Sequence, residues 1–167
     1  MSYVFWILFA IVLIFALTAL TGAPYVPSKT TELKRAFRHL YKLGPDDLLV
    51  DLGSGDGVVL KAARECGARA FGVEINPLLV FLTKVRFWRD KKVQVRSGNL
   101  FRINFPAETT VVYVFGEDRD INKMAAAIAK QAAKLGRDLY VISHAFPIKN
   151  LKPLKTYRAY FLYKIKA

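Results

Sequence analysis

A glycine turn that begins with an acidic residue is the part of this sequence best suited to binding chemistry. The segment Asp51-Leu52-Gly53-Ser54-Gly55-Asp56-Gly57 follows an apolar run at residues 48–52 and precedes a helix-forming stretch. Glycines let a backbone bend sharply and approach a ligand with no side chain in between. The spacing differs from the G-x-G-x-x-G of dinucleotide sites, and the Gly-Lys-Ser/Thr of a phosphate loop is missing. The acid instead favours a ligand that carries a positive charge.

Two further polar residues follow the next two predicted strands. Glu74 lies near the end of the strand predicted at residues 70–75, and Asn99 follows the strand predicted at residues 93–95. The carboxyl ends of parallel strands share one edge of a sheet, and an acid there can accept hydrogen bonds from ribose hydroxyls. The alternative is an ordinary tight turn with a surface acid. The glycine turn, Glu74 and Asn99 each follow one of three successive predicted strands, and this shared position favours a binding site.

These residues need a sheet to position them, and the apolar pattern provides one. Strands alternate with helices, which predicts a Rossmann-like α/β fold with a mostly parallel sheet. The tyrosine-rich tail at residues 157–166 predicts one or two edge strands. The predicted strands are residues 48–52, 70–75, 93–95, 111–115 and 139–143, and the predicted helices are residues 30–43, 58–65, 77–89 and 120–135.

The N-terminus is apolar, and the first charged side chain is Lys29. A helix needs about 20 apolar residues to cross a bilayer, so residues 1–21 are expected to form a transmembrane anchor in contact with lipid. A cleaved signal peptide is the alternative, but no Lys or Arg precedes the apolar run. A linker and pre-domain helix are expected at residues 22–43, and the main domain at residues 44–167. Basic residues just after the anchor predict a single-pass membrane protein with this domain on the cytoplasmic side, or its organellar equivalent.

The chain carries 26 Lys and Arg against 13 Asp and Glu, a formal net charge of +13. This surplus implies an anionic partner, which is nucleic acid, lipid headgroups or an acidic protein. The single cysteine, Cys66, excludes an internal disulfide, and the sequence has no Cys/His cluster that predicts a metal site.

The glycine turn resembles motif I of the class I S-adenosylmethionine-dependent methyltransferases, whose cofactor carries an amino group and a sulfonium. In that superfamily an aspartate is common at the position of Asn99, where it contacts the adenine amino group; the Asn99 carbonyl can also accept that bond. The resemblance implies that the cofactor-binding residues are Asp51, Gly53, Ser54, Gly55, Asp56, Gly57, Glu74, Ile75, Asn99 and Leu100.

The flanking segments resemble a narrower family, the membrane-tethered protein-lysine methyltransferases that modify the mitochondrial adenine nucleotide carrier and the ATP synthase c-subunit, with their prokaryotic relatives. The matching segments are residues 24–28, 114–116 and 142–147. Two departures are the acids Glu117-Asp118 and the short tail after Pro147. The resemblance implies a substrate entrance formed by Tyr25, Val26, Pro27, Ser28, Phe115, Gly116, Phe146 and Pro147.

A lysine amine must lose its proton before it can accept a methyl group, because its ordinary pKa is about 10.4. Burial in an aromatic slot lowers that pKa, and Tyr25 is expected to help form the slot. Glu117 is a candidate to accept the proton or attract the ammonium, and His144 is the candidate general base.

The expected activity is therefore methyl transfer to a lysine of a membrane protein. An RNA or DNA methyltransferase is the alternative enzyme, but the Asn/Asp-Pro-Pro-Tyr motif of amine-methylating nucleic-acid enzymes is absent after residue 115, and the acids Glu117-Asp118 would repel phosphates. Nucleic acid is thus not the expected partner. A non-catalytic membrane adaptor that retains the fold is the remaining alternative.

Overall fold

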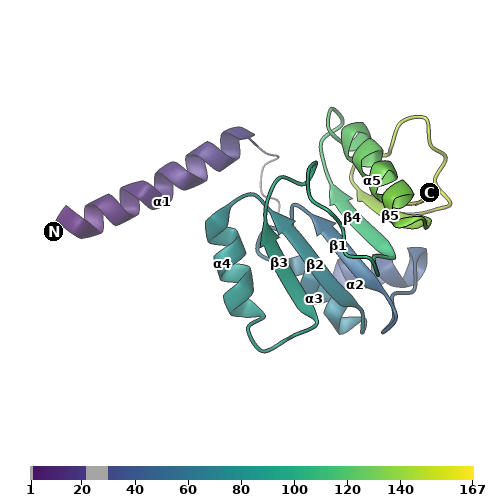
Figure 1. The fold of residues 1–167 in the computed structure, drawn as a ribbon, viewed down its shortest axis with the longest axis horizontal. Coiled ribbons are helices and arrows are strands. Elements are labelled where there is room, and N and C mark those ends of the chain that lie inside the picture. Colours follow the sequence, from purple (N-terminus) through teal and green to yellow (C-terminus); the bar gives the residue numbers. More distant parts are fainter. Residues whose placement is uncertain (1, 22–29) are drawn as a thin grey trace.

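The structure is a computed structural model that describes residues 2–21 and 30–167 (Figure 1). The elements in chain order are α1 (Ser2–Thr21), α2 (Thr30–Leu40), β1 (Leu48–Leu52), α3 (Val58–Glu65), β2 (Arg69–Glu74), α4 (Pro77–Arg86), β3 (Val93–Ser97), β4 (Val111–Phe115), α5 (Ile121–Leu135), β5 (Leu139–His144), β6 (Lys155–Tyr157) and β7 (Tyr160–Ile165).

The strands form one seven-stranded sheet in the order β3-β2-β1-β4-β5-β7-β6. The pairs from β3 through β5 are parallel, and β7 runs antiparallel to both β5 and β6. The predicted Rossmann-like fold with a mostly parallel sheet is thus confirmed. The tail predicted to form one or two edge strands forms the β6–β7 hairpin, in which only β6 is an edge strand, because β7 lies between β5 and β6.

Helices cover both faces of the sheet, and the alternation of side chains along the strands divides the core in two. Leu49 faces the side where Leu33 and Phe37 of α2 pack with α3. Val50 faces the opposite side, where Ile128 of α5 packs. Strand β1 is buried on both faces, as a central parallel strand must be.

Two helices are shorter than the sequence predicts. Helix α2 ends at Leu40 rather than at residue 43, and α4 ends at Arg86 rather than at residue 89. After α4 the amide of Phe87 still bonds to the Thr83 carbonyl, but the amide of Trp88 bonds to the Val85 carbonyl at 3.4 Å. The second bond joins residues three apart in the chain instead of four, so it marks the tighter turn that ends the helix.

Helix α1 projects away from the sheet (Figure 1), and its described side chains, from Tyr3 to Leu13, are exposed. Within residues 2–21 and 30–167, no helix satisfies the length and apolarity required to span a bilayer. The predicted transmembrane anchor over residues 1–21 is therefore not confirmed.

Candidate functional site

The glycine turn continues directly from β1 and is fastened to β2. The amides of Gly53 and Ser54 both donate to the Val73 carbonyl at 2.9 Å, and the Gly57 amide donates to the Ser54 carbonyl at 2.8 Å. Gly53 has a φ of 91°, and an added Cβ there would have no atom within 4 Å. Within residues 2–21 and 30–167, the backbone at Gly53 is thus open on the side where a ligand would approach.

Glu74, at the end of β2, holds this turn in place. One carboxylate oxygen accepts the Gly55 amide at 2.8 Å, and the other accepts the Asn76 amide at 2.8 Å. The side chain is buried. Each oxygen of an ionised carboxylate has a second lone pair, so Glu74 can still accept hydrogen bonds from a ligand.

Asp51 lies beneath the turn and is only 2 % exposed. Its Oδ2 atom and the Ser54 hydroxyl are buried and have no hydrogen-bond partner within the described chain. Burial, with the neighbouring carboxylates of Glu74 and Asp56, raises the pKa of Asp51 well above its ordinary value. A buried polar group without a partner is costly, so these atoms identify a position suited to a hydrogen-bond donor, above all a cationic one.

Helix α4 supports the turn through residues that the sequence did not single out. The Thr83 hydroxyl donates to the Gly55 carbonyl at 3.0 Å. An added Cβ on Gly57 would lie 2.7 Å from the Thr83 methyl carbon, so this glycine is needed for close packing as well as for its φ of 82°. Gly72 on β2 has a similar role, because its Cβ would lie 2.7 Å from the Ser54 hydroxyl. A glycine inside a predicted strand is the sequence signal for such an approach.

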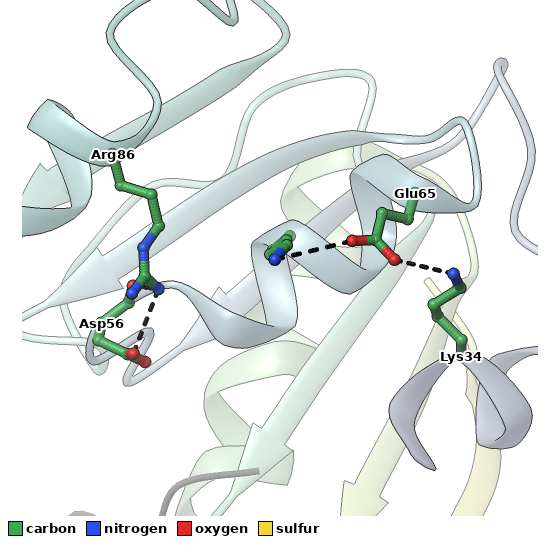
Figure 2. A network of polar contacts seen from close by, with 5 residues as sticks. Lys34, Asp56, Glu65 and Arg86 are labelled. Atoms are coloured by element: carbon green, nitrogen blue, oxygen red, sulfur yellow. Dashed lines mark hydrogen bonds and ion pairs between the residues drawn. The ribbon is translucent and has the colours of Figure 1, made fainter. Parts of the chain in front are cut away.

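Figure 2 shows polar contacts around α3. Arg86 of α4 donates to both the backbone carbonyl and the carboxylate of Asp56 in the turn. At the other end of α3, Glu65 accepts from Lys34 of α2 at 2.8 Å. Asp56 is thus engaged by an arginine, unlike Asp51, and a ligand would have to compete for it.

The ends of β2 and β3 carry the remaining predicted cofactor residues. Glu74 is the register partner of Ser97, so Ile75 and Asn99 follow adjacent strands. Ile75 is exposed and Leu100 is half-buried, which leaves apolar surface beside the turn. The side-chain carbonyl oxygen of Asn99 accepts a hydrogen bond from the Phe101 amide at 2.9 Å. The predicted contact with the adenine amino group would therefore use the second lone pair of that oxygen.

An aromatic cluster around His144 lies at the ends of β4 and β5. Phe115 and His144 are register partners with ring centres 5.2 Å apart. Tyr160 stacks on His144 at 4.2 Å, and the Tyr113 hydroxyl lies 3.0 Å from His144 Nδ1. Burial lowers the pKa of His144, opposed by the carboxylate of Glu32 on α2. The imidazole is therefore neutral at neutral pH and oriented by its neighbours.

The structure does not gather every predicted residue around this cluster. Glu117 forms an ion pair with Arg119 at 3.1 Å, and Asp118 forms one with Lys149 at 2.6 Å. Gly116 is packed so closely against α5 that a Cβ would lie 2.8 Å from Met124 Sδ. Phe146 is half-buried and Pro147 is exposed. The entrance residues Tyr25, Val26, Pro27 and Ser28 lie outside the described residues.

Sequence reasoning missed Tyr113, Tyr160 and Glu32, which all act on His144. Tyr113 and Tyr160 are indistinguishable in the sequence from other strand tyrosines, because only the sheet order brings them to the same histidine. The arrangement as a whole brings together acidic side chains and buried polar atoms without a partner in the described chain at the ends of β1 and β2. It also provides a neutral imidazole among aromatic rings at β4 and β5.

A family model and several curated proteins are similar to this chain. The family model described as "ANTKMT methyltransferase domain" matches residues 51–155. The ATP synthase c-subunit lysine N-methyltransferase of Xenopus laevis is 31% identical over 133 residues, covering 78% of this chain and 56% of that protein. A protein-lysine N-methyltransferase of Saccharolobus islandicus is 30% identical over 135 residues, covering 78% of this chain and 81% of that protein.

Among solved structures, an RNA methyltransferase from Salinibacter ruber in complex with S-adenosyl-L-homocysteine is similar with a TM-score of 0.72 and 28% identity. That similarity covers 84% of this chain and 94% of the other. The chain spans little more than half the length of its curated animal relatives from Xenopus laevis and Homo sapiens.

Proposed function

Because the chain belongs to the ANTKMT methyltransferase domain family, we propose that it transfers a methyl group from S-adenosylmethionine to a lysine side chain. The observation that carries this proposal is the glycine turn with its buried acids. Asp51 Oδ2 is buried without a partner in the described chain, beside a backbone that is open at Gly53. An ammonium group and a sulfonium are the kind of ligand that such a position stabilises.

The residues present fit this cofactor group by group. Asp51 would hold the cationic amino-acid part, and Glu74 would accept hydrogen bonds from the ribose hydroxyls with its remaining lone pairs. The exposed side chain of Ile75 would cover one face of the adenine, with Asn99 and Leu100 beside it. The other contacts would come from Gly53, Ser54, Gly55, Asp56 and Gly57 of the turn.

When bound, S-adenosylmethionine supplies an activated methyl group, and the protein mainly has to align and deprotonate the acceptor amine. Phe115 and Tyr160 would desolvate that amine and so lower its pKa. If His144 donates its Nδ1 proton to the Tyr113 oxygen, its Nε2 atom carries the lone pair that accepts the lysine proton. Tyr25 and Glu117 would line the approach, with Glu117 first released from Arg119.

We also propose that the acceptor belongs to a membrane protein and that α1 brings the enzyme to the bilayer. The relative in Xenopus laevis is named for the c-subunit of ATP synthase. The aromatic and aliphatic side chains of α1 at residues 3–9, 12 and 13 are exposed, and burying them in lipid would be favourable. The domain boundaries proposed for this arrangement are residues 1–21 for membrane contact, 22–43 for the connecting segment and 44–167 for catalysis. Helix α2 of the connecting segment packs into the core of the catalytic domain through Leu33 and Phe37.

The activity test uses purified protein, tritiated S-adenosylmethionine and a membrane lysate. We expect label in protease-sensitive material, at a lysine when the labelled peptide is sequenced by mass spectrometry. Calorimetric titration with the unlabelled cofactor distinguishes an enzyme from an adaptor that retains the fold. Label in nuclease-sensitive material would instead support an RNA methyltransferase, an alternative that the Salinibacter ruber structure makes worth including.

A further inference from the structure

Helix α4 carries apolar side chains on two opposite faces, and the described residues cover only one of them. Val80 and Thr83 are buried against the sheet and the glycine turn. On the outer face Phe81 and Val85, which are 60% and 53% exposed, lie one turn apart and are followed by Trp88 at 72%. Leu82 is exposed beside them. A contiguous exposed apolar patch normally marks an interaction surface, and the outer face of α4 has no covering partner in the described chain.

The charges around this face are basic. At 100° per residue, Lys84 and Arg86 lie on either side of the stripe formed by Phe81 and Val85. Arg89 lies over the Trp88 ring at 4.4 Å, and Lys91 and Lys92 follow. Asp56 offsets Arg86 and Asp90 pairs with Arg64, so the positive surplus comes from Lys84, Arg89, Lys91 and Lys92. The outer face of α4 therefore combines an apolar stripe with a surplus of positive charge.

Anionic lipid headgroups match this combination. A helix that lies in the plane of a bilayer buries an apolar stripe with aromatic residues at the headgroup level, and its basic flanks attract anionic lipids. RNA would satisfy the basic residues and could stack on Trp88. It would gain little from Leu82 and Val85, because aliphatic side chains offer no ring on which a base stacks.

We propose that α4 is a second membrane-contact element, with Phe81, Leu82, Val85 and Trp88 inserted at the headgroup level of an anionic bilayer. The helix begins at Pro77, just after Glu74 and Ile75, so docking it would hold the cofactor end of the sheet close to the membrane surface. This inference names a partner for the proposed site and rests on the proposed function only in that respect. It does not require methyl transfer to occur. Membrane contact through α1 would not by itself imply membrane contact through α4.

The test uses the full chain with the substitution Trp6→Phe. The sequence has two tryptophans, so Trp88 is then the single fluorescent tryptophan. Vesicles contain anionic lipids with acyl chains brominated near the headgroup, and the readout is Trp88 fluorescence. We expect a blue shift, quenching by the bromines and protection from iodide. If the protein does not bind the vesicles, or binds them while Trp88 stays open to iodide, the proposal is wrong. Shielding of Trp88 by RNA alone, or by self-association without vesicles, overturns it as well.

Substitutions on α4 provide the second arm. Val85→Asn should reduce the Trp88 shift and weaken binding to anionic vesicles several-fold, whereas Leu154→Asn should not. Leu154 is a matched control because it is about as exposed as Val85, at 58% against 53%, but lies before β6 on the far edge of the sheet. Lys84→Ala should weaken binding to anionic vesicles about fivefold, with little effect on neutral ones. Thermal melts of each variant verify folding, and methyl transfer can fail in every variant without affecting this result. Equal vesicle binding by Val85→Asn and Leu154→Asn would contradict the proposal.

Discussion

The buried carboxyl of Asp51 couples stability to pH. Because its pKa is raised in the folded protein, it contributes stability below the unfolded pKa of about 3.9, and this contribution is lost as the pH rises through the folded pKa. Asp51→Asn cannot ionise, so it should raise the Tm of the ligand-free protein above the folded pKa and flatten its pH dependence. The same change should abolish cofactor binding. Thermal melts across the acid-to-neutral range and calorimetry measure both effects, and a lower Tm throughout would contradict the first.

Gly53 allows a comparison of strain with ligand contact. Gly53 and Gly136 both have positive φ, 91° and 62°, and neither has an atom within 4 Å of an added Cβ. Alanine at either position should cost about 1–2 kcal/mol of folding free energy, measured by urea denaturation. Only Gly53→Ala should also lose S-adenosylmethionine affinity, because only that Cβ enters the proposed cofactor position. Equal affinity in the two variants would remove Gly53 from the site.

The two histidines of the chain form a matched pair for testing the general base. His144 has its pKa lowered by burial, whereas His39 is exposed and stacks on Tyr157 at 4.2 Å. His144→Gln should lower kcat about a hundredfold or more while leaving cofactor affinity unchanged, and His39→Gln should change neither. The wild-type rate should fall as pH drops through the His144 pKa, since only the neutral imidazole accepts a proton. A His144→Gln variant that keeps this acidic limb would exclude His144 as the base.

At the scale of elements, α4 owes its start to a side-chain cap. Asn76 accepts from the Leu78 amide at 2.9 Å and from the Leu79 amide at 3.4 Å, whereas Asp120 at the start of α5 makes no such bond. Asn76→Ala should therefore cost about 1 kcal/mol of folding free energy, and Asp120→Ala only a few tenths. Urea denaturation of the two variants provides the comparison. If both variants lose the same folding free energy, the Asn76 cap does not stabilise the start of α4.

Elements and turn residues could be predicted because they depend on local patterns. The strand before Gly53 and the acid Glu74 at the end of the next strand follow from an apolar run that meets a turn. The contacts that fix the site could not be predicted in this way. Thr83 and Arg86 reach the glycine turn across 28 and 30 residues of chain, and only the packed helix brings them there.

For the whole molecule, the α/β domain holds its core without α1. The buried residues of both core clusters come from residues 33–165, and the described side chains of α1 are exposed. Deleting residues 1–21 should leave the Tm and the S-adenosylmethionine affinity nearly unchanged. It should reduce methylation of a membrane-bound acceptor, since tethering raises the effective concentration. Calorimetry and the label assay measure these effects, and unchanged methylation would show that α4 or another contact suffices.

The position of β1 also has a consequence for the order of folding. On one side it pairs with β2, its neighbour in the chain, but on the other it pairs Leu49 with Val111 of β4. Closing the longer loop costs more chain entropy, so the β1–α3–β2 unit can form before β4 arrives. The glycine turn and Glu74 belong to that early unit, whereas His144 belongs to the half that docks later. In this order of folding, the parts that would bind the cofactor and the parts that would act on the acceptor would form at different stages, and they would meet only when β1 gains its second neighbour.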